Sequence, residues 1–193
     1  MRFSNLLLVM LSCLTADGQT VDVPGSGRIS TDWLQTPSSN LSSAGAKTIT
    51  LTPCPVGVDT TSGWYYVFIA GEGTPEATPV TGGTCTSGAS SGTIILTTLN
   101  IHSAGYTISS ASQGIQEMTN HARFAPTNPT TTVQSGKIAV PPGEYKAYAR
   151  ISIRASNQTL DFSGSIIECK MDDACLFVGD PRHSNSFENI TII

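Results

Sequence analysis

The stretch that decides the fold runs from Lys137 to Ile166 and reads KIAVPPGEYKAYARISIRASNQTLDFSGSI. Three short runs within it are rich in β-branched and aromatic residues: Ile138 to Val140, Ile151 to Ile153, and Thr159 to Phe162. The runs are too short for core helices, so the pattern predicts strands. Each run is closed by a turn-forming sequence: Pro141-Pro142-Gly143, Ala155-Ser156-Asn157 and Ser163-Gly164.

The spacing of apolar pairs bears on how these strands are arranged. Short strands separated by tight turns usually form neighbouring antiparallel hairpins. In this chain, however, apolar pairs recur after roughly 20 to 30 residues, which is the period of a stacked solenoid. The recurring pairs are Ile151/Ile153 with Leu176/Val178, and Ile166/Ile167 with Ile190/Ile192. We therefore expect parallel strands laid over one another.

Two motifs carry a resemblance to a known family. VPPGEY ends the first strand, and ISIRASNQTLDFSG begins at Ile151; upstream stands Gly114-Ile115-Gln116-Glu117. This combination resembles the entry of the pectate-lyase-like right-handed parallel β-helix, in which a G-I-Q-x helix plugs the first coil. The resemblance covers Ser112 to Ile193. It implies an all-β fold, with a small N-terminal β module followed by a capping helix and the first coils of the β-helix.

Composition limits the classes of partner. The chain has 193 residues, only 12% of them charged, and a formal net charge of −4. A charged share this low, with abundant Gly, Ser and Thr, is typical of extracellular all-β proteins. The chain has no basic footprint, so nucleic acid is not expected as a partner. No stretch is apolar for long enough to cross a membrane, and the oligomeric state is left open.

The N-terminus, residues 1–18, reads as a secretory signal peptide. Arg2 supplies the positive charge and Leu6 to Leu11 the apolar core, and small residues precede a cleavage position before Gln19. Two alternatives remain open: a buried N-terminal strand, or a lipoprotein that is modified at Cys13. The signal peptide predicts a secreted, extracellular protein.

Four cysteines remain after such cleavage, and an even count in a secreted chain indicates two disulfides. Of the three possible pairings we favour Cys54 with Cys85 and Cys169 with Cys175. A zinc site is the alternative, although the chain has no C-x-x-C pair. Free buried thiols are a further alternative if the protein never meets an oxidant.

The rest of the chain divides into three segments. Residues 19–46 are polar and turn-rich, and we expect an extended arm or linker lying over the surface. Residues 47–109 contain five short runs at regular spacing, which predicts a small sandwich or barrel, that is, a small β-sandwich-like module. The expected strands are Thr48 to Leu51, Tyr65 to Ile69, Thr78 to Thr81, Thr93 to Thr97, and Tyr106 to Ile108.

The third segment, residues 110–193, begins with the one helix that the sequence predicts, Ser110 to Phe124. Ser110 or Ser112 can cap it, and Ile115, Met118 and Ala122 share one face. Such a helix can cover the open end of a β-helix, although an ordinary surface helix has the same pattern. Further strands are expected at Ile166 to Glu168, Cys175 to Val178 and Phe187 to Ile193. A solenoid needs about three stacked units, so the sequence reads as the N-terminal part of a longer protein.

Catalytic residues are not identifiable. In the resembling family, polysaccharide binds in a groove along one parallel sheet; hydrolases use paired carboxylates, and lyases use Ca²⁺ and a basic side chain. The motifs N-T-D, G-H-G and R-I-K of polygalacturonase-like members are absent here. We therefore assign no cofactor to this chain, and Ca²⁺ is conceivable only in coils beyond it.

A few residues are weaker candidates. Trp64 and Tyr66 can stack on sugar rings, but core packing is the commoner role of such aromatic side chains. The adjacent Asp172 and Asp173 suit Ca²⁺ binding or acid chemistry, but also suit a solvated loop between cysteines. Three histidines lack partners at ligand spacing and are expected at the surface: His102, His121 and His183.

These observations lead to two main hypotheses of function. The first is a secreted carbohydrate-active protein that cleaves an acidic, pectin-like polysaccharide by hydrolysis or β-elimination. The second is a non-enzymatic adhesin or tail-spike-like protein that uses its β-helix to bind glycans. A weaker third hypothesis is that residues 47–109 bind carbohydrate by themselves.

Overall fold

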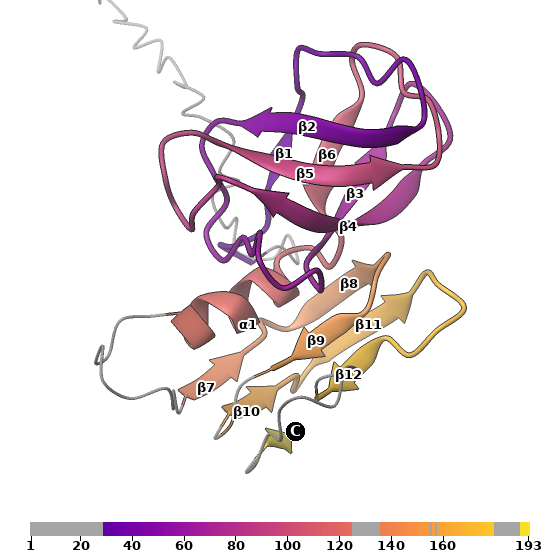
Figure 1. Ribbon diagram of the computed structural model, residues 1–193. Coiled ribbons are helices and arrows are strands. Elements are labelled where there is room, and N and C mark those ends of the chain that lie inside the picture. The colour runs from indigo at the N-terminus through magenta and orange to yellow at the C-terminus, as the bar shows by residue number, and fades with distance from the viewer. Residues whose placement is uncertain (1–28, 125–135, 155, 157, 180–189) are drawn as a thin grey trace, which may run out of the picture.

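The computed structural model describes residues 29–124, 136–154, 156, 158–179 and 190–193 (Figure 1). Within these ranges the chain is mostly β, with a single short helix. The predicted signal peptide, the first part of the expected arm and residues 187–189 of the last expected strand lie outside the described residues. No helix in the described ranges combines the length and the apolar character that crossing a bilayer requires.

The first half of the chain forms a six-stranded antiparallel sheet that curls into a half-barrel (Figure 1). Its strands follow the order β1-β6-β3-β4-β5-β2, in which β3, β4 and β5 form a meander. The strands are β1 (Leu34–Gln35), β2 (Gly45–Leu51), β3 (Tyr66–Ala70), β4 (Glu76–Gly83), β5 (Gly92–Thr98) and β6 (Thr107–Ser110). All five runs expected between residues 47 and 109 correspond to one of these strands.

The core of this half lies on one face of the curled sheet. Buried and less buried residues alternate along β3 and β6, as expected for strands with one face on a core. Fully buried side chains include Ile49, Tyr65, Val67, Leu96 and Ile108. One continuous, strongly twisted sheet therefore encloses the core by curling, which is nearer to the barrel than to the sandwich among the two alternatives that the sequence left open.

Residues 29–46 are part of the fold, so the arm predicted for residues 19–46 does not extend to these residues. Ile29, Trp33 and Leu41 are each at most 4% exposed, and β1 pairs with β6. The polar, turn-rich composition concealed Ile29 and Leu41 as anchors. Each fixes the backbone on either side of it, so few apolar residues suffice to hold the segment against the sheet.

The only helix among the described residues is α1 (Ile115–Phe124), which begins five residues later than predicted. Ser110 and Ser112 lie in the turn before it. The Ser112 hydroxyl accepts the Gln116 N–H at 2.9 Å, which satisfies a donor that the first helical turn leaves unpaired. Two residues of the predicted face are turned to the core, since Ile115 is fully buried and Met118 packs on the same cluster; the side chain of Ala122 lies outside what the structure describes.

The second half consists of parallel strand pairs in which each strand pairs with the third strand after it. Thus β7 pairs with β10, β8 with β11, β9 with β12, and β10 with β13. The strands are β7 (Gly136–Ala139), β8 (Gly143–Ala147), β9 (Ile151–Ile153), β10 (Gln158–Asp161), β11 (Ser165–Cys169), β12 (Leu176–Val178) and β13 (Thr191–Ile192). In Figure 1 these strands form the lower part of the molecule, below and to the right of α1.

One of the two predicted apolar repeats is confirmed. Leu176 is the register partner of Ile151, and Val178 is the partner of Ile153. The other repeat is wrong, because Ile192 pairs with Leu160 of β10 and not with β11. The sequence analysis also missed strand β8, because Pro141-Pro142-Gly143 at its start reads as a turn. The signal for a strand was the alternation of Tyr145 and Ala147 with charged residues after this turn.

A second hydrophobic cluster lies between α1 and the parallel strands. It contains Ile115 of the helix with Val140, Tyr145, Ala147 and Ile151, and Ile29 joins it from the first half. The helix is thus packed on both sides, with the parallel strands on one and the curled sheet on the other (Figure 1). This arrangement fixes the two halves against each other.

Candidate functional site

The two predicted sugar-contact residues lie at the start of β3. Trp64 and Tyr66 are half-buried, whereas Tyr65 between them is fully buried in the core. Neither Trp64 nor Tyr66 lines the cavities described below. Tyr66 does share the outer face of β3 with Phe68, because side chains two residues apart point to the same side of a strand.

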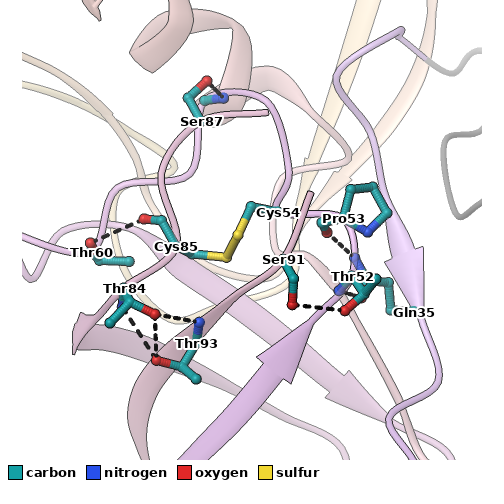
Figure 2. The surroundings of a disulfide bond; sticks show 11 residues. Gln35, Thr52, Pro53, Cys54, Thr60, Thr84, Cys85, Ser87, Ser91 and Thr93 are labelled. Carbon is teal, nitrogen blue, oxygen red and sulfur yellow. Dashed lines mark hydrogen bonds between the residues drawn. A yellow bond between two sulfur atoms is a disulfide. The ribbon is translucent and has the colours of Figure 1, made fainter. Parts of the chain in front are cut away.

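Both predicted disulfides are present. Cys54 bonds Cys85, with the Cα atoms 5.6 Å apart and both residues buried, and this bond joins the loop after β2 to the loop before β5 (Figure 2). Beside it Thr84 and Thr93 exchange hydrogen bonds through their hydroxyl groups. Cys169 bonds Cys175, and this bond closes a short loop between β11 and β12.

The candidate carboxylate pair lies in that short loop. Asp173 forms an ion pair with Arg150, and its other oxygen accepts the Ala174 N–H at 2.7 Å. The Arg150 guanidinium lies 5.7 Å from the ring centroid of Phe177. Asp173 therefore organises its own loop, as the solvated-loop interpretation predicted. Within the described ranges, no three His, Cys, Asp or Glu side chains are grouped so that they could hold a metal ion.

One histidine differs from the prediction. His102 is completely buried, not at the surface, and its Nε2 lies 2.9 Å from Oε1 of Glu76. Glu76 also accepts the backbone N–H groups of Leu99 and Asn100 at 2.7 and 3.0 Å. This contact anchors the loop between β5 and β6. His121 is exposed as predicted, and His183 lies outside the described residues.

A buried carboxylate that the sequence did not single out lies at the junction of the two halves. Glu117 of α1 is 0% exposed. Its Oε1 accepts hydrogen bonds from Trp33 Nε1 and the Tyr65 hydroxyl, each at 2.8 Å. Its Oε2 accepts the Ser110 hydroxyl at 2.8 Å and is 3.5 Å from that of Ser112. We call these five residues the Glu117 cluster.

Burial dominates the acidity of this cluster. Loss of water around the carboxyl raises the pKa of Glu117 from 4.5 to about 7, and the hydrogen bonds from Tyr65, Ser110 and Trp33 oppose the rise. The pKa of Tyr65 lies well above its ordinary value, first because it is buried and then because of the nearby Glu117 charge. The phenol thus stays a neutral donor near neutral pH. This cluster is a structural anchor with a titratable centre.

An open groove lies beside this anchor. One cavity of about 440 Å³ lies over β8 and β11 and is lined by Gln113, Glu144, Tyr145, Lys146, Tyr148, Ile166 and Glu168. A second cavity of about 180 Å³ lies against the outer face of β1, β3 and β6, with Phe68, Ser109 and Ser110 in its lining. Gln113 and Tyr148 line both cavities. We call the combined feature the junction groove.

The groove has the size and chemistry of a ligand site. Sites for small ligands usually occupy about 300 to 1,000 Å³ and combine aromatic surface with a few polar groups. Tyr148 supplies aromatic surface, Gln113 an amide, and Lys146 a positive charge. Sequence reasoning missed all three. The one signal for these residues in the sequence was the alternation of Glu144, Lys146 and Tyr148, which follows the segment Pro141-Pro142-Gly143 that reads as a turn.

Comparisons with known proteins add no relationship. No family model, curated protein or solved structure matches the chain significantly. The resemblance to the pectate-lyase-like family therefore rests on the sequence motifs alone.

Proposed function

We propose that this chain is a secreted protein that acts on an acidic polysaccharide and that its second half begins a right-handed parallel β-helix. The observation that carries the proposal is the pairing in which each strand from β7 to β10 has the third strand after it as a parallel partner. A chain that winds in coils of three strands produces this pairing. Nearly all crossovers between parallel strands of one sheet are right-handed.

The packing of α1 supports the same architecture. Ile115 covers apolar side chains of β8 and β9, including Tyr145 and Ile151, which an uncapped first coil would expose. The motifs VPPGEY and ISIRASNQTLDFSG lie at β7 to β10, where the resembling family begins its coils. An acidic polysaccharide is proposed because the family acts on such polymers.

Secretion is supported by the cysteines. Disulfides persist in oxidising compartments and are rare in the cytosol. Mass spectrometry of material secreted by an expression host tests the proposal. We expect a polypeptide that begins at Gln19 and contains no free thiol at Cys54, Cys85, Cys169 or Cys175; retention of residues 1–18 would contradict it.

Incubation with polygalacturonate and with its methyl-esterified form tests the activity. Elimination creates a carbon–carbon double bond conjugated to the uronate carboxylate, so ultraviolet absorbance and reducing ends rise together. Hydrolysis adds water across the glycosidic bond, so reducing ends rise alone. Binding to an immobilised panel of neutral and acidic polysaccharides is measured in parallel. Retention by no polysaccharide of the panel would overturn the proposed function.

A second candidate function is glycan binding without cleavage. One observation favours it: Glu168, which lines the junction groove, forms an ion pair with Lys170, and this hydrogen bond lowers the pKa of Glu168. A carboxylate with a lowered pKa is a poor general acid. Retention on the polysaccharide panel without new reducing ends would favour this function.

A further inference from the structure

The junction groove has a fixed aromatic surface. The ring of Tyr148 stacks on that of Phe68 with centroids 3.8 Å apart and an angle of 12° between the planes. The Tyr148 backbone N–H also donates to the Ala111 carbonyl at 2.7 Å. Tyr148 follows β8 and Phe68 lies in β3, so this contact joins the two halves. A ring held in this way can bind a ligand without losing further side-chain freedom.

The groove also has a positioned amide. The Gln113 Oε1 accepts the Lys146 backbone N–H at 2.5 Å, which fixes the side chain across the groove. Gln113 has a φ of 51°, a conformation that residues other than Gly adopt rarely and at a free-energy cost. Among the described residues its Nε2 has no hydrogen-bond acceptor. This group can donate to a hydroxyl or carboxylate oxygen of a ligand.

The groove also has a positive charge, the ammonium group of Lys146 on β8. Glu144 and Lys146 occupy alternate positions on the outer side of β8, and Tyr148, the first residue after the strand, continues this alternation. Glu168 is the register partner of Lys146 but is already in an ion pair with Lys170. Lys146 is exposed and forms no ion pair within the described residues. An anionic ligand group at this point meets the Lys146 ammonium beside an amide donor. The carboxylates of Glu144 and Glu168 also line the groove, and Lys146 together with Lys170 offsets the Glu168 charge.

From these three features we propose that the junction groove is a binding subsite for an oligosaccharide that carries a uronate carboxylate. The apolar face of one sugar ring lies on Tyr148, Gln113 donates to ring substituents, and Lys146 binds the carboxylate. The inference rests on the proposed function for its ligand class, but it places binding at the boundary between the curled sheet and the first parallel strands.

Calorimetric titration of the full chain with oligogalacturonate and with its methyl-esterified form tests the subsite. The wild type is expected to prefer the charged ligand. Lys146→Gln should weaken binding of the charged ligand by about tenfold and leave the ester unaffected, because only the ion pair is lost. Tyr148→Ala should weaken both ligands by about tenfold, whereas Tyr148→Phe should retain the stacking surface and bind nearly as the wild type does.

Lys47→Gln is the matched control, because Lys47 lies on β2 at the far edge of the six-stranded sheet and carries the same charge. It should change neither affinity. Thermal melting of each variant shows whether it folds; if Tyr148→Ala does not fold, the selectivity of Lys146→Gln decides.

A wild type that binds but loses nothing in Lys146→Gln overturns the subsite and leaves the proposed function standing. Equal affinity of the wild type for acid and ester also overturns it. A wild type that binds neither ligand overturns the subsite as well, and the polysaccharide panel then decides whether the broader function fails with it.

Discussion

The carboxylate of Glu117 accepts a 2.8 Å hydrogen bond from the hydroxyl of Tyr65, and this contact ties helix α1 to the interior of the curled sheet. The indole of Trp33 donates to the same oxygen. Because α1 also packs on the parallel strands, one buried carboxyl group lies at the point where the two halves of the chain meet. Its ionisation is therefore coupled to how firmly the halves are joined.

We predict that stability falls as the pH rises from about 4.5 to 7. The pKa of Glu117 is raised to about 7 in the folded chain, so between these values the folded state binds more protons than the unfolded state. Its contribution is complete below pH 4.5, declines as the pH rises through 7, and then stays constant. The free energy of unfolding should be on the order of 3 kcal/mol lower above pH 7 than below pH 4.5. Urea unfolding across this range measures it.

Glu117→Gln is the control for this prediction, since it keeps the shape of the side chain and cannot titrate. The other ionisable groups near the cluster, Tyr65 and Asp32, are unchanged in it. The wild-type stability minus the variant stability should therefore fall with rising pH. A difference that does not change between pH 4.5 and 7 would show that Glu117 titrates normally.

Gly57→Ala should weaken the attachment of α1. A Cβ atom at Gly57 would lie 2.1 Å from the Glu117 carbonyl oxygen, and the φ of 80° disfavours any side chain. Gly63 has a similar φ of 70° with no atom near its Cβ position, so Gly63→Ala measures the backbone strain alone. Gly63→Ala should lower the free energy of unfolding by about 1 to 2 kcal/mol, and Gly57→Ala should lower it by clearly more, as measured by chemical unfolding. Equal losses would contradict the close approach.

Local patterns in the sequence predicted much of the fold. β-branched runs located β9 at Ile151–Ile153, and the apolar repeat placed Leu176 beside Ile151. Strand β8 was missed because its entry, Pro141-Pro142-Gly143, carries a strong turn signal. The sequence left a sandwich and a barrel both open for the first sheet, since whether strands close into one sheet or two depends on pairing between distant segments.

The site was largely hidden from sequence reasoning. The acceptor Glu117 lies 84 residues from Trp33 and 52 from Tyr65, and nothing local marks such partners. An acidic residue in a first helical turn is ordinarily explained by the helix dipole. The stacked pair of Tyr148 and Phe68 likewise comes from different halves of the chain. The cysteines were the exception, because their even number restricts the possible partners.

The two disulfides should differ in their contribution to stability. Cys54 and Cys85 are 31 residues apart, whereas Cys169 and Cys175 are 6 apart. In the chain-entropy model a longer closed loop restricts the unfolded state more, which gives roughly 4 kcal/mol for the first and 2 for the second. Chemical unfolding of the two double-alanine variants measures this. A larger loss for Cys169→Ala with Cys175→Ala would contradict the loop-length argument.

Two buried glutamines should respond in opposite ways to replacement by leucine. Both are nearly inaccessible, Gln158 at 1% and Gln116 at 5%. Within the described part of the chain, the Gln158 amide has no hydrogen-bond partner for either polar atom. Gln116, in contrast, donates to Asn120 and to the Ser152 carbonyl and accepts the Ser152 N–H at 2.6 Å.

An unpaired buried amide costs about 1 to 3 kcal/mol, so Gln158→Leu should raise the melting temperature. Gln116→Leu should lower it, because the backbone groups of Ser152 lose their partner and α1 loses a contact to β9. The two substitutions are chemically identical, so a general benefit of added apolar volume would raise both melting temperatures. Destabilisation by Gln158→Leu would mean that its amide is hydrogen-bonded in solution.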